Sequence, residues 1–170
     1  MAVIREISTP DPSLLPALCH LLQDSVDGGA SVGFVSPLPP EEAEAFWREI
    51  LDELGPDLRL WIAEDEGEVV GSVQMARCTK PNGRHRAEVR KLAVLRSARG
   101  RGIASGLMVA LETAAREMRL RLLYLDTHAG SAAEHLYHHL GWTRAGEIPD
   151  YATTPTGELH PTVLFFKVFD

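Results

Sequence analysis

Apolar residues recur at helical spacing in four stretches of the chain. In the longest stretch the apolar positions step by three or four: Ile103, Leu107, Leu111, Ala114 and Met118. Because an α-helix completes a turn in 3.6 residues, this spacing places all five on one face and predicts an amphipathic helix from Gly102 to Leu120. Similar spacing and helix-start signals predict helices over residues 11–28, 41–54 and 131–140.

Shorter apolar runs between these helices predict strands. Each run is bounded by turn residues, such as Glu66-Gly67 or Pro81-Asn82-Gly83, which is typical of strands in a sheet. The runs cover residues 3–7, 60–63, 69–77, 87–95, 122–127, 143–148 and 162–168. This mixed order predicts an α/β or α+β fold with one central sheet, as a single domain over residues 1–170.

Composition narrows the class of protein. The chain is 45% hydrophobic and 24% charged, and it has only two cysteines, a balance typical of a globular protein without a disulfide framework. No apolar run approaches the ~20 residues of a membrane span, and the first residues do not resemble a secretory signal. We therefore expect a cytoplasmic protein that does not enter membranes.

The distribution of charge indicates the kind of ligand. The net charge is −7, yet nine of the seventeen basic residues lie between Arg77 and Arg101, accompanied by one acid, Glu88. A local positive field on an acidic protein favours a small polyanion over nucleic acid. Any single arginine of this block is equally well explained as solvated surface.

The end of the basic block combines arginine and glycine ahead of a helix. Residues 96–107 read RSARGRGIASGL, between a predicted strand and the long predicted helix. The first N–H groups of a helix lack internal partners and carry partial positive charge, and glycine lets an anion approach the backbone. This stretch therefore predicts a diphosphate cradle, with a flexible surface turn as the alternative.

Other nucleotide and catalytic motifs fit less well. Ser105 stands where a dinucleotide-binding G-x-G-x-x-G motif needs its third glycine, and no Gly-Lys-Ser/Thr of a P-loop is present. Residues 29–33 match G-x-S-x-G, but a hydrolase elbow needs a strand before it and a helix after it. The histidines of residues 135–139 lack further metal ligands nearby, so no metal site is predicted.

The segment Arg99-Gly100-Arg101-Gly102-Ile103-Ala104 resembles the Q/R-x-x-G-x-G/A motif of the GCN5-related N-acetyltransferase (GNAT) family. The order of predicted elements resembles that family along nearly the whole chain. Further segments resemble family members that acetylate a tabtoxinine-β-lactam-like toxin: GGASVGF (28–34), KPNG (80–83), RAEVRKLAVLRSARGRGIA (86–104), LDTHAGSAAEHLY (125–137) and LHPT (159–162).

The resemblance implies a fold, an activity and a cofactor. The fold would be a mixed, mostly antiparallel sheet of six to seven strands flanked by about four helices. The activity would be transfer of an acetyl group from acetyl-CoA to the amine of a small molecule. Domains of this family often form homodimers. Two alternatives stay open: an N-acetyltransferase of proteins or peptides, and a non-catalytic acyl-CoA-binding module.

The resemblance also assigns residues to the cofactor. The backbone of Leu92, Ala93 and Val94 would pair with the pantetheine arm like an added strand. The diphosphate would bind the amides of the motif, namely Arg99, Gly100, Arg101, Gly102, Ile103 and Ala104. Relatives often hold pantetheine with an asparagine after the next strand, where this chain has His128-Ala129-Gly130.

Three residues are candidates for the chemistry. Acetylation of a protonated amine needs a base, and Glu88, the one acid in the basic block, is the first candidate, with Asp126 the second. Tyr137 lies where the family has its general-acid tyrosine. The alternatives are a surface ion pair for Glu88, a turn cap for Asp126 and a core aromatic for Tyr137.

The acceptor amine is expected near the loop between the first two helices. Ser31 and Phe34 lie in this loop, and Tyr151 follows the strand predicted at residues 143–148. We expect these three side chains to line the acceptor pocket.

Overall fold

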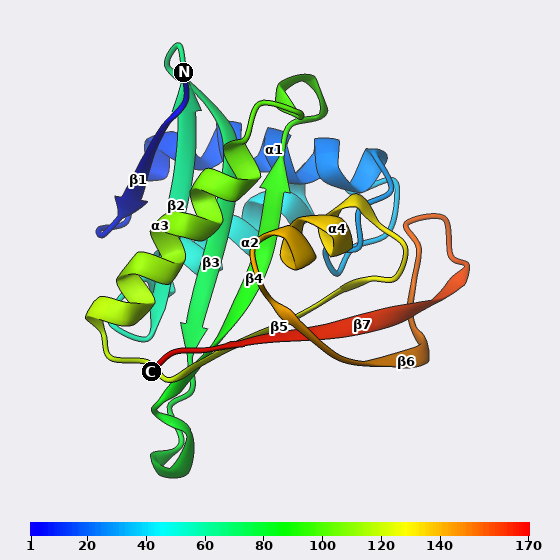
Figure 1. Cartoon of the computed structure of the whole chain (residues 1–170). Helices are drawn as coiled ribbons and strands as arrows, with labels where there is room; N and C mark the ends of the chain where they lie inside the picture. Colours follow the sequence, from blue (N-terminus) through cyan, green and yellow to red (C-terminus); the bar gives the residue numbers. More distant parts are fainter.

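A seven-stranded sheet crosses the molecule, with strand order β1-β2-β3-β4-β5-β7-β6. The computed structural model describes all residues from 1 to 170 (Figure 1). The strands are β1 (Val3–Ile7), β2 (Leu58–Asp65), β3 (Glu68–Arg77), β4 (Arg86–Val94), β5 (Leu122–His128), β6 (Thr143–Thr153) and β7 (Leu159–Val168). The α-helices are α1 (Leu15–Asp27), α2 (Pro40–Glu53), α3 (Ile103–Glu117) and α4 (Ala132–His139). The predicted mixed, mostly antiparallel sheet with four helices is confirmed.

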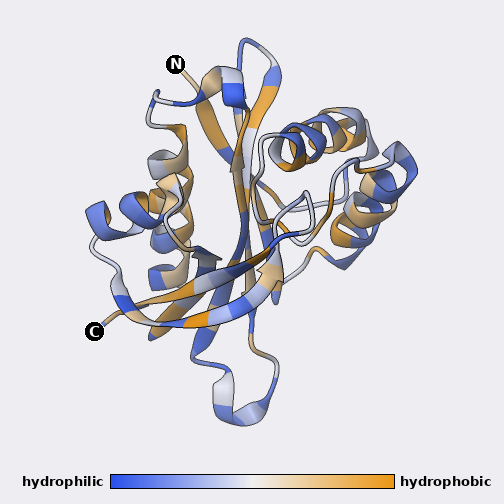
Figure 2. Ribbon diagram, turned by 90° about the vertical axis from the view of Figure 1, so that its right-hand side faces the viewer, coloured by the Kyte–Doolittle hydropathy of each residue, from blue (hydrophilic) through white to orange (hydrophobic).

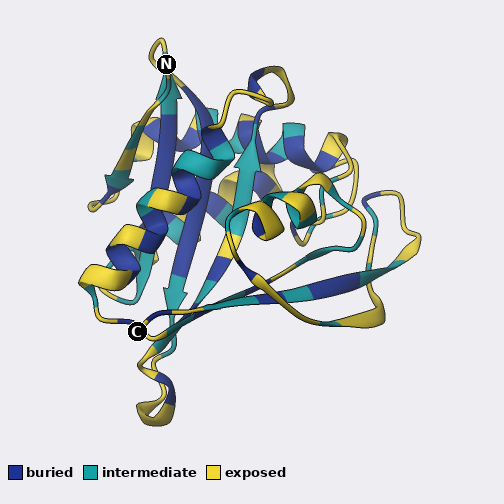
Figure 3. Ribbon diagram, in the orientation of Figure 1, coloured by how far each residue is buried: buried dark blue, intermediate teal, exposed yellow.

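Helices cover both faces of the sheet. Seen edge-on in Figure 2, α1 and α2 lie on one side of the sheet, and α3 with α4 lies on the other. The central strand β3 is therefore buried along most of its length, and β2 is buried in its middle (Figure 3). Strands covered on both faces need apolar residues at successive positions, as in Leu60–Ala63 of β2.

The helical periodicity places the core residues correctly, and the helix ends differ by a few residues. Ile103, Leu107 and Leu111 are buried as predicted. However, α3 ends at Glu117 rather than Leu120, because Arg119 adopts a left-handed conformation with φ of 58°, and the Leu120 amide then donates back to the carbonyl of Ala115. This is a common way for a helix to end.

The one parallel pairing in the sheet is short. Residues Arg86–Glu88 of β4 pair with Leu122–Tyr124 of β5, and the two strands then separate. Beyond this point β4 also bulges against β3: the register shifts between Ser72 and Gln74, and Lys91 has φ of 54°. A bulge bends its strand and redirects side chains, so β4 turns away from β5 and leaves an opening between them (Figure 1).

The last two strands form a longer hairpin than the sequence pattern predicts. We expect strands over residues 143–148 and 162–168, whereas β6 extends to Thr153 and β7 begins at Leu159. The extension is exposed (Figure 3), so it lacks the apolar alternation from which a half-buried strand is recognised. The hairpin projects beside the opening between β4 and β5 (Figure 1).

Candidate active site

A cavity of about 560 Å³ lies at the opening between β4 and β5. Its walls come from the α1–α2 loop and α2 on one face of the sheet, from β3, β4 and β5, and from α4 on the other face. Residues 151 and 152 of β6 complete the lining. The volume is in the range of pockets that bind small molecules.

Glu88 reaches this cavity from β4, immediately before the strands separate. Its carboxylate accepts a hydrogen bond from Arg90, whose guanidinium forms an ion pair with it at 2.7 Å. The Glu88 side chain is 26% exposed. The ion pair and the cavity position therefore occur together, so the two interpretations that the sequence left open are not exclusive.

Asp126 lies across the opening, on β5. Its carboxylate accepts a hydrogen bond of 3.0 Å from the hydroxyl of Thr162 on β7. Because Thr162 is buried, this bond fixes the carboxylate at the wall of the cavity. Asp126 thus has a partner on the neighbouring strand rather than in the turn that follows it.

Tyr137 enters the cavity from α4 and is almost completely buried. Its ring packs between Trp142 and Phe165, with centroids 5.8 and 5.7 Å away. Burial, and to a lesser extent the negative charge of Asp126, raises the pKa of Tyr137 above its ordinary value. The phenol therefore keeps its proton at neutral pH and is available as a donor.

The arginine–glycine stretch forms an open turn at the start of α3. Gly100 and Gly102 have φ of 75° and 76°, and nothing lies within 4 Å of a Cβ atom built at either position. The amides of residues 100–104 donate no hydrogen bond to any backbone carbonyl. Five adjacent free donors at a helix N-terminus match the requirements of a diphosphate.

The arginines around this turn do not all face an incoming anion. Arg96 binds Asp24, and Arg101 binds Asp65 at 2.5 Å. The Arg99 guanidinium donates only to the carbonyl of Val94, at 3.4 Å. Its backbone amide donates to the carbonyl of Arg96, so the expectation that this amide binds the diphosphate needs correction. Two of the three positive charges that the basic block brings to this turn are therefore balanced by acids from distant parts of the sequence.

The edge of β4 beside the turn has no strand partner on the β5 side. Pairing with β5 ends at Glu88, so residues Leu92–Val94 keep backbone donors and acceptors available toward the opening. An extended ligand can pair with such an edge as an added strand. Of these three residues, Leu92 also lines the cavity.

Two of the three expected acceptor residues line the cavity. Ser31 in the α1–α2 loop and Tyr151 on β6 do so, whereas Phe34 does not. Phe34 packs edge-on against Phe46 of α2, with ring centroids 5.2 Å apart. It supports the wall from behind rather than forming it.

Two further polar residues of the cavity have no counterpart in the sequence interpretation: Gln74 of β3 and Lys91 of the β4 bulge. A lone amide in the run Val69–Met75, whose one other polar side chain is Ser72, was the available signal for Gln74. No sequence signal indicated Lys91, because its orientation depends on the bulge.

His128 occupies the end of β5 at the cavity wall. Its ring stacks on that of His160, with centroids 3.3 Å apart. Burial, followed by the nearby His160, lowers the pKa of His128. The imidazole is therefore neutral at pH 7 and does not add positive charge to the site.

The family to which this fold and site correspond is identified by comparison. A model of the Acetyltransferase (GNAT) family matches residues 17–142. The chain belongs to this family. As a GNAT protein it is an N-acetyltransferase, and acetyl-CoA is the donor that its family uses.

Relatives of known sequence agree with this assignment. An uncharacterized N-acetyltransferase from the hisH–hisA intergenic region of Azospirillum brasilense is 31% identical over 125 residues, which cover 72% of this chain and 73% of the relative. The uncharacterized N-acetyltransferase YjgM of Escherichia coli strain K12 is 37% identical over 115 residues, covering 64% of this chain and 66% of YjgM.

Solved structures share the GNAT fold along the whole chain. An N-acetyltransferase from Staphylococcus aureus Mu50 superposes with a TM-score of 0.82 at 20% identity, covering 99% of this chain and 98% of the other. YncA from Salmonella typhimurium, solved with its cofactor acetyl-CoA, gives a TM-score of 0.81 at 20% identity. The superposition covers 100% of this chain and 95% of YncA.

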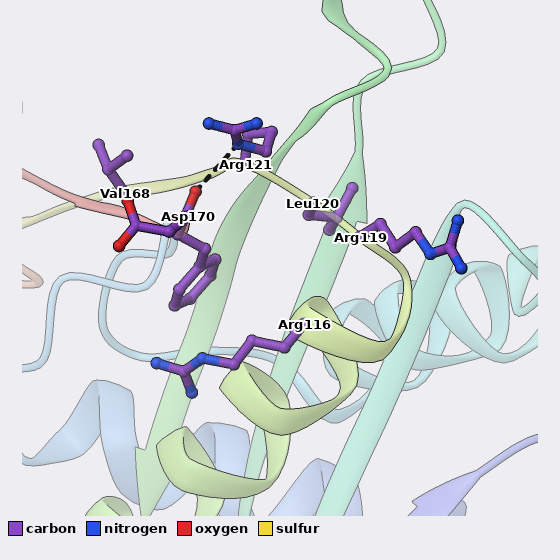
Figure 4. Close-up of a pocket in the computed structure, with 7 residues that line it drawn as sticks. Arg116, Arg119, Leu120, Arg121, Val168 and Asp170 are labelled. Carbon is purple, nitrogen blue, oxygen red and sulfur yellow. Dashed lines mark hydrogen bonds between the residues drawn. The ribbon is translucent and has the colours of Figure 1, made fainter.

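A second cavity of this GNAT domain, about 550 Å³, lies at the far end of α3 and contains three arginines (Figure 4). Arg116 lies over the ring of Phe169 at 4.5 Å, and Arg121 donates to the Phe169 carbonyl at 3.0 Å. The three guanidinium groups, including that of Arg119, point in different directions (Figure 4). They do not converge on one anion.

The helices of the domain are too short or too polar to traverse a bilayer.

Proposed function

We propose that this GNAT enzyme acetylates the amine of a small, amino-acid-like molecule. The observation that carries the proposal is the cavity of about 560 Å³ in which Glu88, Asp126 and Tyr137 meet. The α1–α2 loop and the β6–β7 hairpin border this cavity. Such borders favour a small acceptor over a long peptide, which needs an open groove.

The residues present fit acetyl-CoA. The free amides of residues 100–104 match its diphosphate, and the unpaired edge of Leu92–Val94 matches its pantetheine arm. When bound there, acetyl-CoA supplies an activated acyl group as a thioester. Arg99, with no acidic partner, adds a positive charge beside the turn. We infer that these residues hold the donor.

Two of the three central side chains carry the proton transfers, and the third attracts the acceptor. The amine of the acceptor arrives protonated, and the Glu88 carboxylate is placed to remove that proton, directly or through water. Asp126, on the opposite wall, is placed to attract the ammonium form. The buried Tyr137 hydroxyl keeps its proton at neutral pH and is placed to give it to the departing thiolate.

The test is release of free thiol from acetyl-CoA over a panel of amines: amino acids, toxins related to tabtoxinine-β-lactam, polyamines and peptides. We expect turnover with members of the small-molecule groups and a fall of about 10²–10⁴-fold in kcat for Glu88→Gln. The deficit should shrink as the pH approaches the amine pKa of about 10, where the acceptor loses its proton unaided.

Two results would overturn the proposal. Turnover confined to peptides would favour the alternative of a peptide N-acetyltransferase. Tight binding of acetyl-CoA without thiol release for any amine would favour a non-catalytic acyl-CoA-binding module.

We also propose that two copies associate and that the protein works in the cytoplasm. The outer strand β6 exposes Ile148 and Tyr151, and Leu159 at the start of β7 is 63% exposed. Exposed apolar residues on an edge strand favour association. Both Cys19 and Cys78 are free thiols, consistent with a reducing compartment. Light scattering during size exclusion tests the dimer: a monomer mass at assay concentration would exclude it.

A further inference from the structure

Lys91 brings a positive charge into the cavity without an acidic partner. Its half-buried side chain leaves the β4 bulge, and the ammonium donates a hydrogen bond to the carbonyl of Val32 in the α1–α2 loop. The ammonium also lies 5.8 Å from the ring centroids of Phe34 and Phe46. No carboxylate lies within 4.0 Å of it, although the other cation of the cavity, Arg90, is paired with Glu88.

The environment of Lys91 is unfavourable for its charge. Burial is the main factor that lowers the pKa of Lys91, and the charge of Arg90 lowers it further. Asp126 and Glu88 act in the opposite direction without reversing the shift. An anion bound beside the ammonium would compensate the charge. Since an ammonium has three donors and Val32 accepts one bond, two remain for such a ligand.

Gln74 adds a second unsatisfied donor to the same cavity. It is 1% exposed, and its amide nitrogen has no hydrogen-bond partner. A buried polar group without a partner costs free energy, so it needs an explanation. Ser72 and Trp47 also carry buried polar atoms without partners, but only Gln74 lines the cavity.

We propose that Lys91 and Gln74 bind a carboxylate of the acceptor, so that the acceptor is an amine that also carries a carboxylate. A carboxylate has two oxygens that only accept hydrogen bonds, which matches the free donors of an ammonium and a primary amide. The inference rests on the proposed function. It adds the anionic group of the substrate and assigns Lys91 and Gln74 as residues that determine specificity.

The wild-type test compares each acid with its own carboxamide, which lacks the negative charge. The acids are glycine, β-alanine, 4-aminobutyrate and 5-aminovalerate, and across this series the spacing from amine to carboxylate increases. Thiol release is measured in parallel with direct binding to the enzyme saturated with coenzyme A. We expect at least one acid to bind and react with about 10-fold to 100-fold advantage over its carboxamide, the range of a charged hydrogen bond.

The variants are Lys91→Met and Gln74→Glu, with Lys80→Met and Ser72→Ala as controls. Lys80 is an exposed lysine on the β3–β4 loop. Ser72 is a buried residue of β3, the strand that carries Gln74, and it lies outside the cavity. We expect KM for the preferred acid to rise about 10-fold to 100-fold in both test variants, so that the preference for the acid over its carboxamide is lost. Lys91→Arg should restore most of the preference. Thermal unfolding and the affinity for acetyl-CoA identify a variant that has merely lost its fold. If Lys91→Met is lost in this way, Gln74→Glu remains as the test.

The outcomes separate the two proposals. Turnover of amines with no preference for acids over carboxamides would overturn the carboxylate subsite and leave the acetyltransferase proposal standing. Selective binding of acids, reduced by Lys91→Met, without thiol release would support the subsite and overturn the proposed function. An equal loss with Lys80→Met or Ser72→Ala would also overturn the subsite, because the effect would then not depend on the cavity.

Discussion

Asp24 at the end of α1 binds Arg96 twice: its carboxylate accepts one bond from the Arg96 backbone amide and one from the guanidinium, each 2.9 Å long. The two residues are 72 positions apart in the sequence. Arg96 opens the short 3₁₀ turn that leads into the arginine–glycine turn before α3. The pair therefore connects the helix before the acceptor loop to the segment proposed to hold the donor.

Replacing Asp24 with asparagine should loosen this connection. We expect the free energy of unfolding to fall by about 1 kcal/mol, since the guanidinium is half exposed and solvent weakens the ion pair. The KM for acetyl-CoA should rise, because residues 96–98 position the turn that follows. Urea denaturation and thiol-release kinetics measure the two effects. An unchanged KM would show that the turn holds its shape without Asp24.

The same pair predicts a dependence on pH. Burial by itself would raise the pKa of Asp24, but the bonds and charge of Arg96 outweigh burial and hold this pKa below its ordinary value. A lowered pKa contributes stability that is complete above the unfolded pKa of about 4 and is lost as the pH falls through the folded pKa. The stability difference between wild type and Asp24→Asn should therefore be full at pH 6 and disappear in acid. A difference that grew in acid would contradict this assignment.

Replacing Gly102 with alanine tests the turn itself. A side chain at φ of 76° costs about 1 kcal/mol, and the added methyl group occupies the space above the free amides. We expect KM for acetyl-CoA to rise at least tenfold, with kcat at saturation little changed. Gly157→Ala is the matched control, because Gly157 also has a positive φ and open surroundings but lies in the β6–β7 turn. Equal effects of the two variants on KM would mean that the turn does not hold the donor.

Replacing Tyr137 with phenylalanine removes the proposed general acid while keeping the ring between Trp142 and Phe165. We expect kcat to fall by about 10²-fold, with stability and acceptor KM nearly unchanged. Tyr124→Phe on β5, outside the cavity, should have no such effect. Because the Tyr137 pKa is raised, wild-type kcat should show no loss from this group between pH 7 and 9. Full activity of Tyr137→Phe would exclude the assigned role.

Glu112 of α3 provides a test of stability without effect on the proposed chemistry. Its buried carboxylate accepts bonds from the indole of Trp142 at 2.9 Å and from the ammonium of Lys167 at 2.7 Å. Glu112→Ala leaves both donors without this partner, so the free energy of unfolding, measured in urea, should fall by about 3 kcal/mol. Glu112→Gln retains an acceptor for Trp142, so its free energy of unfolding should fall by less. An equal loss of stability in both variants would show that the acceptor for Trp142 contributes little and that the loss comes from the charge, and wild-type stability of Glu112→Ala would contradict the prediction.

Local spacing was sufficient to predict the elements of the fold. Helix α3 and the short strand β5 follow from apolar periodicity, because the positions that must be buried are set by turn and pleat geometry within one segment. The exposed end of β6 does not follow, since edge strands in solvent carry no such periodicity. Glu88 is indicated by the sequence itself, as the one acid in the basic block, and Asp126 as the acid at the end of an apolar strand. The role of Tyr137 comes only from the resemblance to a family.

Features that depend on partners distant in the sequence were not predictable. Nothing near Arg96 or Arg101 indicates that Asp24 and Asp65 balance their charges, because the pairs form only when the sheet is assembled. The direction of Lys91 depends on a bulge set by the register of β3 and β4. Gln74 is one of two buried polar residues in the mostly apolar strand β3, and of these two it alone lines the cavity.

The brevity of the β4–β5 pairing has a consequence for how such a protein diversifies. Three paired positions are enough to keep the two halves of the sheet together, and past them the sheet is open to both of its sides. The segment proposed to hold the donor, before α3, and the loop proposed to border the acceptor, between α1 and α2, are therefore separate parts of the chain. If the proposed assignment holds, mutations in the α1–α2 loop change which amine is accepted while the turn before α3 stays as it is.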